Sequence, residues 1–189
     1  RQGSSGNERH VGSYAEYRPQ TDSFHRSSGT AYSLPLTPST ADSYRALGSR
    51  SWSDFGLSSQ KITVDESNSP IVAYQYHSST SGSSPRDTWV AFAGSSGWTS
   101  SMVATGRINT WVTHHGGTTN VYTTTTSQDE LWLSRSSTGT SWTTTALTSG
   151  ASVRGLGVVS TAQGRDLVWM QEGANYDILL GSVCLTGSC

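Results

Sequence analysis

Short apolar runs separated by polar turn residues make up most of this chain. The runs are rich in Val, Ile, Leu, Ala and aromatic residues, and they are bounded by Gly, Ser, Pro, Asn and Asp. This pattern is typical of β-strands joined by turns. No long stretch repeats its apolar residues at the spacing of a helix. The pattern therefore predicts an all-β fold.

The predicted strands group into sets of similar layout. They lie at Lys61–Val64, Pro70–Tyr76, Asp87–Phe92 and Ser101–Ala104, then at Ile108–Thr113, Asn120–Thr125, Glu130–Ser134 and Thr143–Leu147, and finally at Val153–Val159, Asp166–Gln171 and Tyr176–Val183. Sets of four short antiparallel strands are typical of β-propeller blades. We expect four blades at approximately residues 1–55, 56–105, 106–150 and 151–189. A β-sandwich would also have short strands, but it need not repeat a Gly-x-Trp turn.

A propeller fragment of this size has a physical consequence. A few blades cannot close a ring, and an open ring leaves strand edges and apolar faces exposed. We therefore expect an N-terminal propeller segment or a second chain to complete the fold. Self-association is the alternative.

Composition narrows the class of protein. The 189 residues carry a formal net charge of -1, and only 13% of them are charged. Near neutrality argues against a nucleic-acid-binding protein, which needs clustered Lys and Arg. No apolar run approaches the roughly 20 residues of a membrane helix, so we expect no membrane partner.

The two cysteines, Cys184 and Cys189, lie close together at the end of the sequence. A turn between them would bring the two thiols within reach of a disulfide. Metal binding is a weaker alternative, because two thiolates without further ligands make a poor zinc site, and a pair of free thiols also remains open. The disulfide is favoured, and it predicts an oxidising compartment and a secreted, extracellular protein.

One turn resembles a known propeller motif. The segment Ser134–Trp142 resembles a degraded Asp box, the Ser-x-Asp-x-Gly-x-Thr-Trp hairpin of sialidase-like propellers. Ser136 stands where the motif has Asp, and one residue is inserted before Gly139. The motif is structural, so it indicates a fold and not a reaction.

A longer resemblance covers most of the chain. Its segments are Ser13–Tyr17, Phe24–Gly29, Leu34–Thr37, Asp65–Pro70 and Gly94–Trp98. In order and spacing they resemble BNR-repeat (sialidase-like) polysaccharide lyases, which include ulvan lyases and fungal rhamnose–glucuronate lyases. The resemblance implies that residues 1–189 are the later blades of a seven-bladed propeller. It also implies a secreted lyase component that cleaves an acidic rhamnose–glucuronate-type polysaccharide by β-elimination.

Elimination of this kind needs a base for the uronate C5 proton, an acid for the leaving oxygen and a group that neutralises the carboxylate. The resemblance points to Tyr14 as a catalytic phenol in the Tyr-x-x-Tyr strand. His25, in the Phe-x-Arg-like segment, is the second catalytic candidate. Packing of Tyr14 between blades is the structural alternative, and Tyr14 and Tyr17 should face opposite sides of a strand.

Four further residues are candidates for substrate binding. Tyr17 and Arg18 follow Tyr14, and the Arg18 fork suits a uronate carboxylate. His10 precedes the tyrosine strand. His114 belongs to the conspicuous segment His114–Gly117, where glycines allow close approach of a substrate. An exposed loop position is the alternative for Arg18 and for His114.

Other functions and cofactors are less well supported by the residues. A non-catalytic, lectin-like propeller would use the same abundance of Trp and Tyr. A sialidase-like glycoside hydrolase is disfavoured, since Asp129 and Glu130 are adjacent and diverge on a strand, and the arginines lack the context of a sialidase triad. The sequence requires no cofactor, although the resemblance allows a structural calcium or zinc ion.

Overall fold

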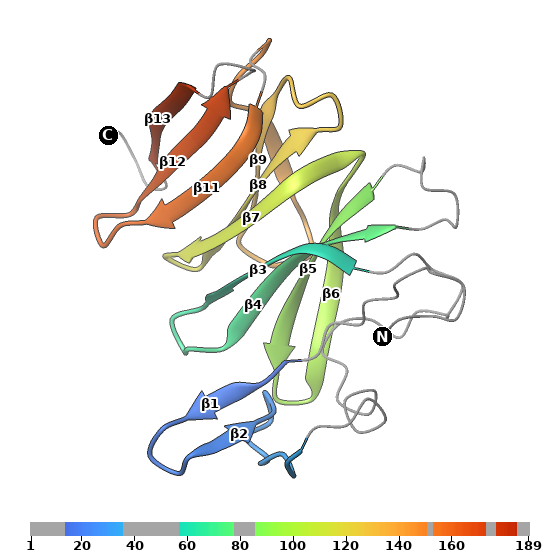
Figure 1. Ribbon diagram of the computed structural model, residues 1–189, viewed down its shortest axis with the longest axis vertical. Helices are drawn as coiled ribbons and strands as arrows, with labels where there is room; N and C mark the ends of the chain where they lie inside the picture. The colour runs from blue at the N-terminus through green and yellow to red at the C-terminus, as the bar shows by residue number, and fades with distance from the viewer. Residues whose placement is uncertain (1–13, 36–56, 78–85, 151–152, 173–176, 185–189) are drawn as a thin grey trace.

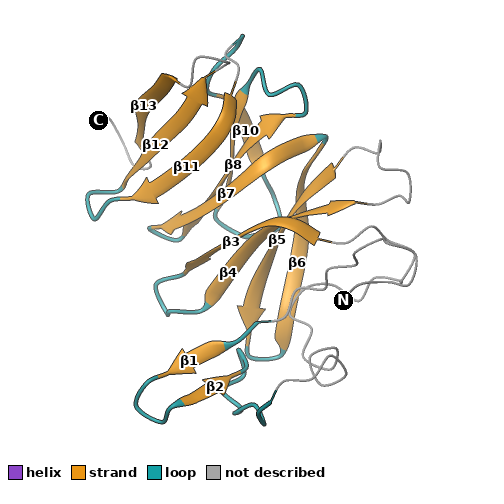
Figure 2. Cartoon of the chain, in the orientation of Figure 1, coloured by secondary structure: helices purple, strands orange, loops and turns teal. Residues whose placement is uncertain are grey.

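A computed structural model describes residues 14–35, 57–77, 86–150, 153–172 and 177–184. These residues form strands, turns and loops without a helix, which confirms the all-β prediction (Figure 2). The strands, coloured from blue to red in Figure 1, are β1 (Glu16–Arg18), β2 (Ser23–His25), β3 (Leu57–Val64), β4 (Pro70–His77), β5 (Arg86–Gly94), β6 (Gly97–Thr105), β7 (Arg107–His115), β8 (Thr118–Thr125), β9 (Leu131–Ser136), β10 (Thr143–Ala146), β11 (Val153–Ser160), β12 (Arg165–Glu172) and β13 (Asp177–Cys184). Among the described residues, no helix is long and apolar enough to cross a membrane.

The strands form four antiparallel sheets in which neighbours in space are neighbours in sequence. β1 pairs with β2, the second sheet has the order β3-β4-β5-β6, the third β7-β8-β9-β10 and the fourth β11-β12-β13. Each predicted strand overlaps an observed one, and the deviations at the ends are one or a few residues. The β5–β6 turn lies where the Gly94–Trp98 segment predicted it, with Gly94 paired to Gly97.

Continuous apolar runs such as Ile71–Tyr74 give the β3–β6 and β7–β10 sheets apolar side chains on both faces, because successive side chains of a strand point to opposite faces. Ile71, Ala73 and Val90 of the β3–β6 sheet pack against Val112 and Val121 of the β7–β10 sheet. On the opposite face of the β7–β10 sheet, a second cluster joins it to β11–β13. β7 contacts both β3 and β11, so the first strands of the three larger sheets lie side by side.

The turn between β9 and β10 ties two sheets together. The Ser136 hydroxyl accepts hydrogen bonds from the backbone N–H groups of Gly139 at 2.8 Å and Thr138 at 3.2 Å. Gly139 has a φ of 74°, which favours glycine. Trp142 packs against the cluster between the β3–β6 and β7–β10 sheets, and its Nε1 donates to Ser101 Oγ at 3.1 Å. The hydroxyl of Ser136, which stands where the motif that this turn resembles has Asp, therefore holds the turn through its backbone N–H groups.

The C-terminal cysteine pair is only partly within the described residues. Cys184 ends β13, and Cys189 lies outside the described residues. The disulfide between Cys184 and Cys189 stays a prediction, and so does the secretion inferred from it.

Candidate functional site

The hairpin β1–β2 presents one half-buried face and one exposed face. Along residues 14–18 the burial alternates, with Tyr14, Glu16 and Arg18 half-buried and the residues between them exposed. His25 on β2 lies directly opposite Glu16 on β1. The half-buried face therefore brings together four polar or ionisable side chains, of which the sequence predicted three: Tyr14, Arg18 and His25.

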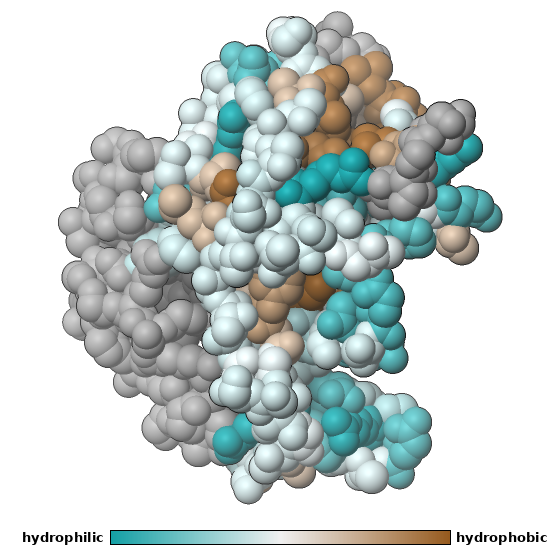
Figure 3. All heavy atoms as spheres, turned by 180° about the vertical axis from the view of Figure 1, so that it is seen from behind, coloured by the Kyte–Doolittle hydropathy of each residue, from teal (hydrophilic) through white to brown (hydrophobic). Residues whose placement is uncertain are grey.

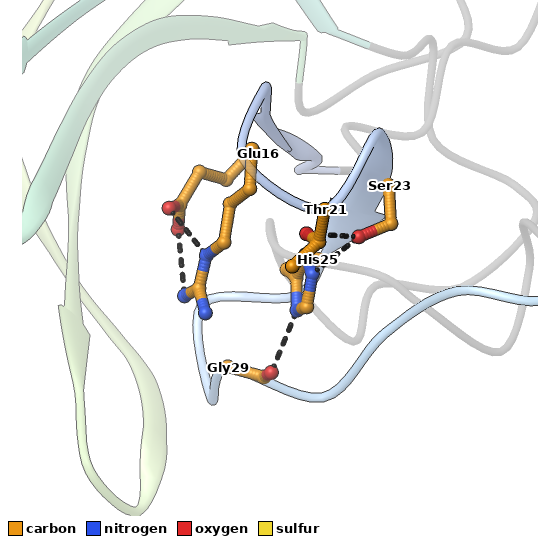
Figure 4. Close-up of polar contacts among 6 residues, drawn as sticks. Glu16, Thr21, Ser23, His25 and Gly29 are labelled. Atoms are coloured by element: carbon orange, nitrogen blue, oxygen red, sulfur yellow. Dashed lines mark hydrogen bonds and ion pairs between the residues drawn. The ribbon is translucent and has the colours of Figure 1, made fainter.

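Arg18 is held by Glu16 on this face (Figure 4). The Nε and Nη2 groups of Arg18 donate to the two carboxylate oxygens of Glu16 at 2.8 and 3.3 Å. The hydrogen bond from Arg18 lowers the pKa of Glu16, so this carboxylate is charged at neutral pH. Both partners are partly exposed, so the pair contributes little to stability. A substrate carboxylate would compete with Glu16 for the same guanidinium group.

The His25 ring is positioned by its own hairpin and the loop that follows. Nδ1 lies 2.8 Å from the carbonyl oxygen of Gly29, and Nε2 lies 2.8 Å from Ser23 Oγ (Figure 4). A carbonyl oxygen only accepts hydrogen bonds, so Nδ1 carries a proton. In the neutral ring, Nε2 is then the basic nitrogen and accepts from the Ser23 hydroxyl.

Tyr14 lies between this face and the next sheet. Its ring contacts the Trp98 ring of β6, with centroids 5.5 Å apart, and belongs to the cluster on the outer face of the β3–β6 sheet. The Tyr32 hydroxyl donates to the Tyr14 backbone carbonyl. Burial and the negative charge of Glu16 raise the pKa of the Tyr14 phenol, with a smaller opposing effect from Arg18. The phenol therefore stays protonated at neutral pH.

Tyr17 lies on the opposite face of the hairpin, as the strand alternation predicted. Its ring is 50% exposed and contacts Phe24 at a centroid distance of 5.2 Å. Its hydroxyl donates to Asp22 at 2.7 Å. Tyr17 therefore does not share the face of Tyr14, Arg18 and His25.

His114 belongs to a different contact. Its Nε2 lies 2.8 Å from Glu66 Oε2, and its Nδ1 lies 2.9 Å from Thr119 Oγ1. The other Glu66 oxygen accepts the Gly117 N–H at 2.7 Å. The turn between β3 and β4 therefore binds the end of the β7–β8 hairpin, and the two turns lie at the same edge of the molecule (Figure 1). These contacts do not join His114 to the β1–β2 hairpin. His10 lies outside the described residues.

The Glu66 contact predicts a loss of stability in acid. The Gly117 N–H bond is the largest of the effects that lower the pKa of Glu66 to about 2, with smaller contributions from its own backbone and from His114. A carboxylate whose pKa is lower in the folded state stabilises the fold above its unfolded pKa, and this stabilisation is lost as the pH falls toward the folded value. Glu66→Gln should therefore lower the melting temperature near neutral pH but make little difference near pH ~2.

Glu130→Gln is the matched control for this experiment. The Glu130 carboxylate accepts the Trp132 indole N–H at 2.8 Å, and a glutamine oxygen accepts the same bond. Burial lowers the pKa of Arg107 and the Glu130 charge opposes this shift, but Arg107 carries its positive charge throughout the pH range of the experiment, so any loss from this interaction is the same at each pH at which Glu130 is ionised. The control should melt like the unmodified chain across the pH range. A Glu66→Gln variant that melts like the control at every pH contradicts the stabilising role of this contact.

Sequence reasoning missed a fully buried carboxylate. The Asp166 carboxylate on β12 is fully buried and accepts hydrogen bonds from three hydroxyl groups on three strands. The donors are Thr113 and Tyr122, both at 2.6 Å, and Ser160 at 2.5 Å. Burial is the largest of the effects that raise the pKa of the Tyr122 phenol, and its hydrogen bond to Asp166 is the second. Alternation along β12 would have placed Asp166 on the same buried face as Val168 and Met170.

The described part of the chain contains no group of three or more His, Cys, Asp or Glu side chains that could hold a metal ion. The expectation about cofactors therefore stays a prediction. No protein-family model matches the chain, and no curated protein sequence matches it. A functional assignment thus depends on the chemistry of the β1–β2 face and on the resemblance of the sequence segments.

Proposed function

We propose that the chain is a component of a secreted polysaccharide lyase that cleaves an acidic rhamnose–glucuronate-type polysaccharide by β-elimination. The observation that carries this proposal is the half-buried face of β1–β2, where Tyr14, Arg18 and His25 come together. A phenol, an arginine and a histidine are suitable as the acid, the group that neutralises the carboxylate and the base that β-elimination requires.

Each group has a role that fits its surroundings. The His25 Nε2 takes the C5 proton of the uronate, with Nδ1–H held by Gly29. The electrons of the C5–H bond form the C4–C5 double bond, and the bond from C4 to the glycosidic oxygen breaks. Tyr14 gives its proton to that oxygen. Its raised pKa keeps the phenol protonated at neutral pH, so the proton is present when the bond to the leaving oxygen breaks. Arg18 exchanges Glu16 for the uronate carboxylate and neutralises its charge.

The fold supports a propeller fragment. The first strands β3, β7 and β11 lie side by side, and successive sheets pack face to face through apolar clusters. Sheets that radiate from adjacent first strands are the arrangement of propeller blades. In the proposal these sheets are later blades of a seven-bladed, BNR-repeat propeller of the lyase type. An N-terminal propeller segment or a second chain would complete the ring and supply the remaining active-site groups.

The test is a product assay on the assembled propeller with a rhamnose–glucuronate polymer. β-Elimination produces an unsaturated uronate that absorbs in the ultraviolet, so absorbance and new reducing ends should appear in equal amounts. New reducing ends without absorbance would identify a hydrolase instead. Absence of both products, with the polymer bound, would identify the carbohydrate-binding alternative.

One observation favours that alternative, a lectin-like propeller without catalysis. Tyr17 and Phe24 form an exposed aromatic pair on the other face of the hairpin. Exposed aromatic rings stack on the apolar faces of sugars. Tyr17→Ala would then weaken polymer binding measured by calorimetry, whereas a lyase that binds on the Tyr14 face would keep its affinity.

A further inference from the structure

Ser23 on β2 has the hydrogen bonds of an activated nucleophile. Its Oγ lies 2.8 Å from Nε2 of His25, and Nδ1 of the same ring lies 2.8 Å from the carbonyl oxygen of Gly29 (Figure 4). Ser23 and His25 are two positions apart on one strand, so their side chains point to the same face of the hairpin. A hydroxyl within hydrogen-bond reach of a histidine that a third group orients is the arrangement of enzymes with a serine nucleophile.

The hydrogen bonds of this group have one possible direction when the imidazole ring is neutral. The Gly29 carbonyl can only accept, so Nδ1 of His25 carries the ring proton and Nε2 accepts from the Ser23 hydroxyl. The hydroxyl has one proton, so the Thr21 hydroxyl, whose Oγ1 lies 2.7 Å from Ser23 Oγ, donates to the serine oxygen. The Ser23 proton is therefore already directed at the base that would receive it.

Two charged side chains on β1 lie opposite this pair. Glu16 is paired with His25 in the strand register. The hydrogen bond from Arg18 is the largest of the effects that lower the pKa of Glu16, and the positive charge of His25 also lowers it. The Glu16 carboxylate therefore stabilises the imidazolium that forms when His25 takes a proton.

Arg18 is paired with Ser23 across the same hairpin. A Cβ atom at Gly29 would lie 3.8 Å from Arg18 Nη2, so the guanidinium group lies beside the residue that binds the histidine ring. Arg18 uses Nε and Nη2 for its hydrogen bonds to Glu16, and Nη1 takes no part in them. The Nη1 group is therefore a donor for a negatively charged oxygen that develops next to Ser23.

The surroundings of Ser23 are polar and open. Ser23 and His25 are partly exposed, and Thr21 is exposed. Figure 3 shows mainly hydrophilic residues at the lower end of the molecule, where the β1–β2 hairpin lies. A long acyl chain would have no apolar surface beside the nucleophile, because the Tyr17 ring lies on the opposite face of the hairpin. The site therefore suits a substrate with a small acyl group.

We propose that the chain hydrolyses carboxylic esters with a small acyl group, with Ser23 as the nucleophile. Ser23 Oγ attacks the ester carbonyl carbon, its proton passes to His25 Nε2, and Arg18 stabilises the oxyanion. The bond to the alcohol oxygen then breaks, and this oxygen takes the proton from Nε2. A water molecule gives a proton to the same nitrogen and attacks the acyl-serine. The carboxylic acid leaves, and Ser23 Oγ takes its proton back.

Ester hydrolysis goes beyond the proposed β-elimination and does not depend on it. Both reactions use Nε2 of His25 as the base, but only ester hydrolysis needs the Ser23 oxygen as a nucleophile. An ester probe without a uronate cannot undergo the elimination. Its hydrolysis therefore tests Ser23 separately from the lyase assignment, and either proposal can fail while the other stands.

Labelling of the full chain with a fluorophosphonate tests the nucleophile. Ser23 Oγ should attack the phosphorus atom and release fluoride while His25 takes the proton, and peptide mass spectrometry should find the phosphonyl group on Ser23. p-Nitrophenyl acetate is the substrate probe, and its hydrolysis is followed by the absorbance of p-nitrophenolate. Ser23→Ala should abolish the labelling, and Ser23→Ala and His25→Gln should each lower the rate of ester hydrolysis by about a hundredfold or more.

Ser28→Ala is the matched control, because it removes a hydroxyl from the loop that follows β2, where Ser28 contacts Thr30. Its labelling and its rate of hydrolysis should match those of the unmodified chain. Absence of the label from Ser23 in a chain that circular dichroism shows to be folded would overturn the proposal. Ser23→Ala with the rate of the unmodified chain would also overturn it, since the imidazole of His25 or another side chain would then be the catalyst. Equal losses in Ser23→Ala and Ser28→Ala would have the same meaning.

Discussion

Replacing Tyr14 with phenylalanine lowers the rate of β-elimination by about a hundredfold or more, if Tyr14 is the acid of the reaction. The variant loses only the phenolic oxygen. The ring still packs against Trp98, and the Tyr32 hydroxyl still donates to the backbone carbonyl at position 14. The rate is measured as unsaturated-uronate absorbance on the assembled propeller, in which the proposal has further active-site groups supplied by the segment that completes the ring.

The matched control is Tyr17→Phe, which removes a phenolic oxygen from the opposite face of the same hairpin. It breaks an exposed hydrogen bond to Asp22 and leaves the Tyr14 face unchanged, so turnover should stay near normal. The melting temperatures of both variants should match the unmodified chain within a few degrees. A Tyr14→Phe variant with near-normal turnover and unchanged melting would rule out the catalytic role of Tyr14.

The strands were predictable because their signals are local. In Pro70–Tyr76 and Asp166–Gln171 a β-branched or aromatic run sits between turn residues, and pairing with neighbours in sequence needs no long-range information. The opposite orientations of Tyr14 and Tyr17 followed from the same alternation. The turn at Ser134–Trp142 was predicted as a structural element, and the structure shows the hydroxyl of Ser136 accepting the turn N–H groups.

The contacts of the candidate site were less predictable, because they depend on how separate segments pack. Nothing in the sequence around His114 indicates that Glu66, 48 residues away, would bind it. The ion pair of Arg18 with Glu16 is a local contact, and alternate positions on one strand could have suggested it. The sequence suggested Arg18 as a ligand for a uronate carboxylate, and the structure shows its guanidinium group bound to the Glu16 carboxylate.

Replacing Asp166 with alanine should destabilise the full chain by about 3–5 kcal/mol. The substitution leaves three buried hydroxyl groups, of Thr113, Tyr122 and Ser160, without their acceptor, and it opens a space at the contact between two sheets. A buried polar group that loses its partner costs about 1–3 kcal/mol, although such costs are not additive. The measurement is the midpoint of urea unfolding, converted with an unchanged slope.

A series of smaller changes tests whether the carboxylate acts through these hydrogen bonds. Asp166→Asn keeps the shape and one oxygen of the side chain, and a rotated hydroxyl can accept from the new amide, so the loss of stability should be about 1–2 kcal/mol.

Tyr122→Phe removes one donor and should lower the stability by about 1 kcal/mol when Asp166 is present. The loss should be much smaller in the Asp166→Ala background, because the two residues interact directly. Asp129→Ala, in an exposed turn, controls for the loss of a negative charge and should cost well under half of the Asp166→Ala effect. Equal losses for Tyr122→Phe in both backgrounds would show that the hydrogen bond between Tyr122 and Asp166 does not stabilise the contact between the two sheets.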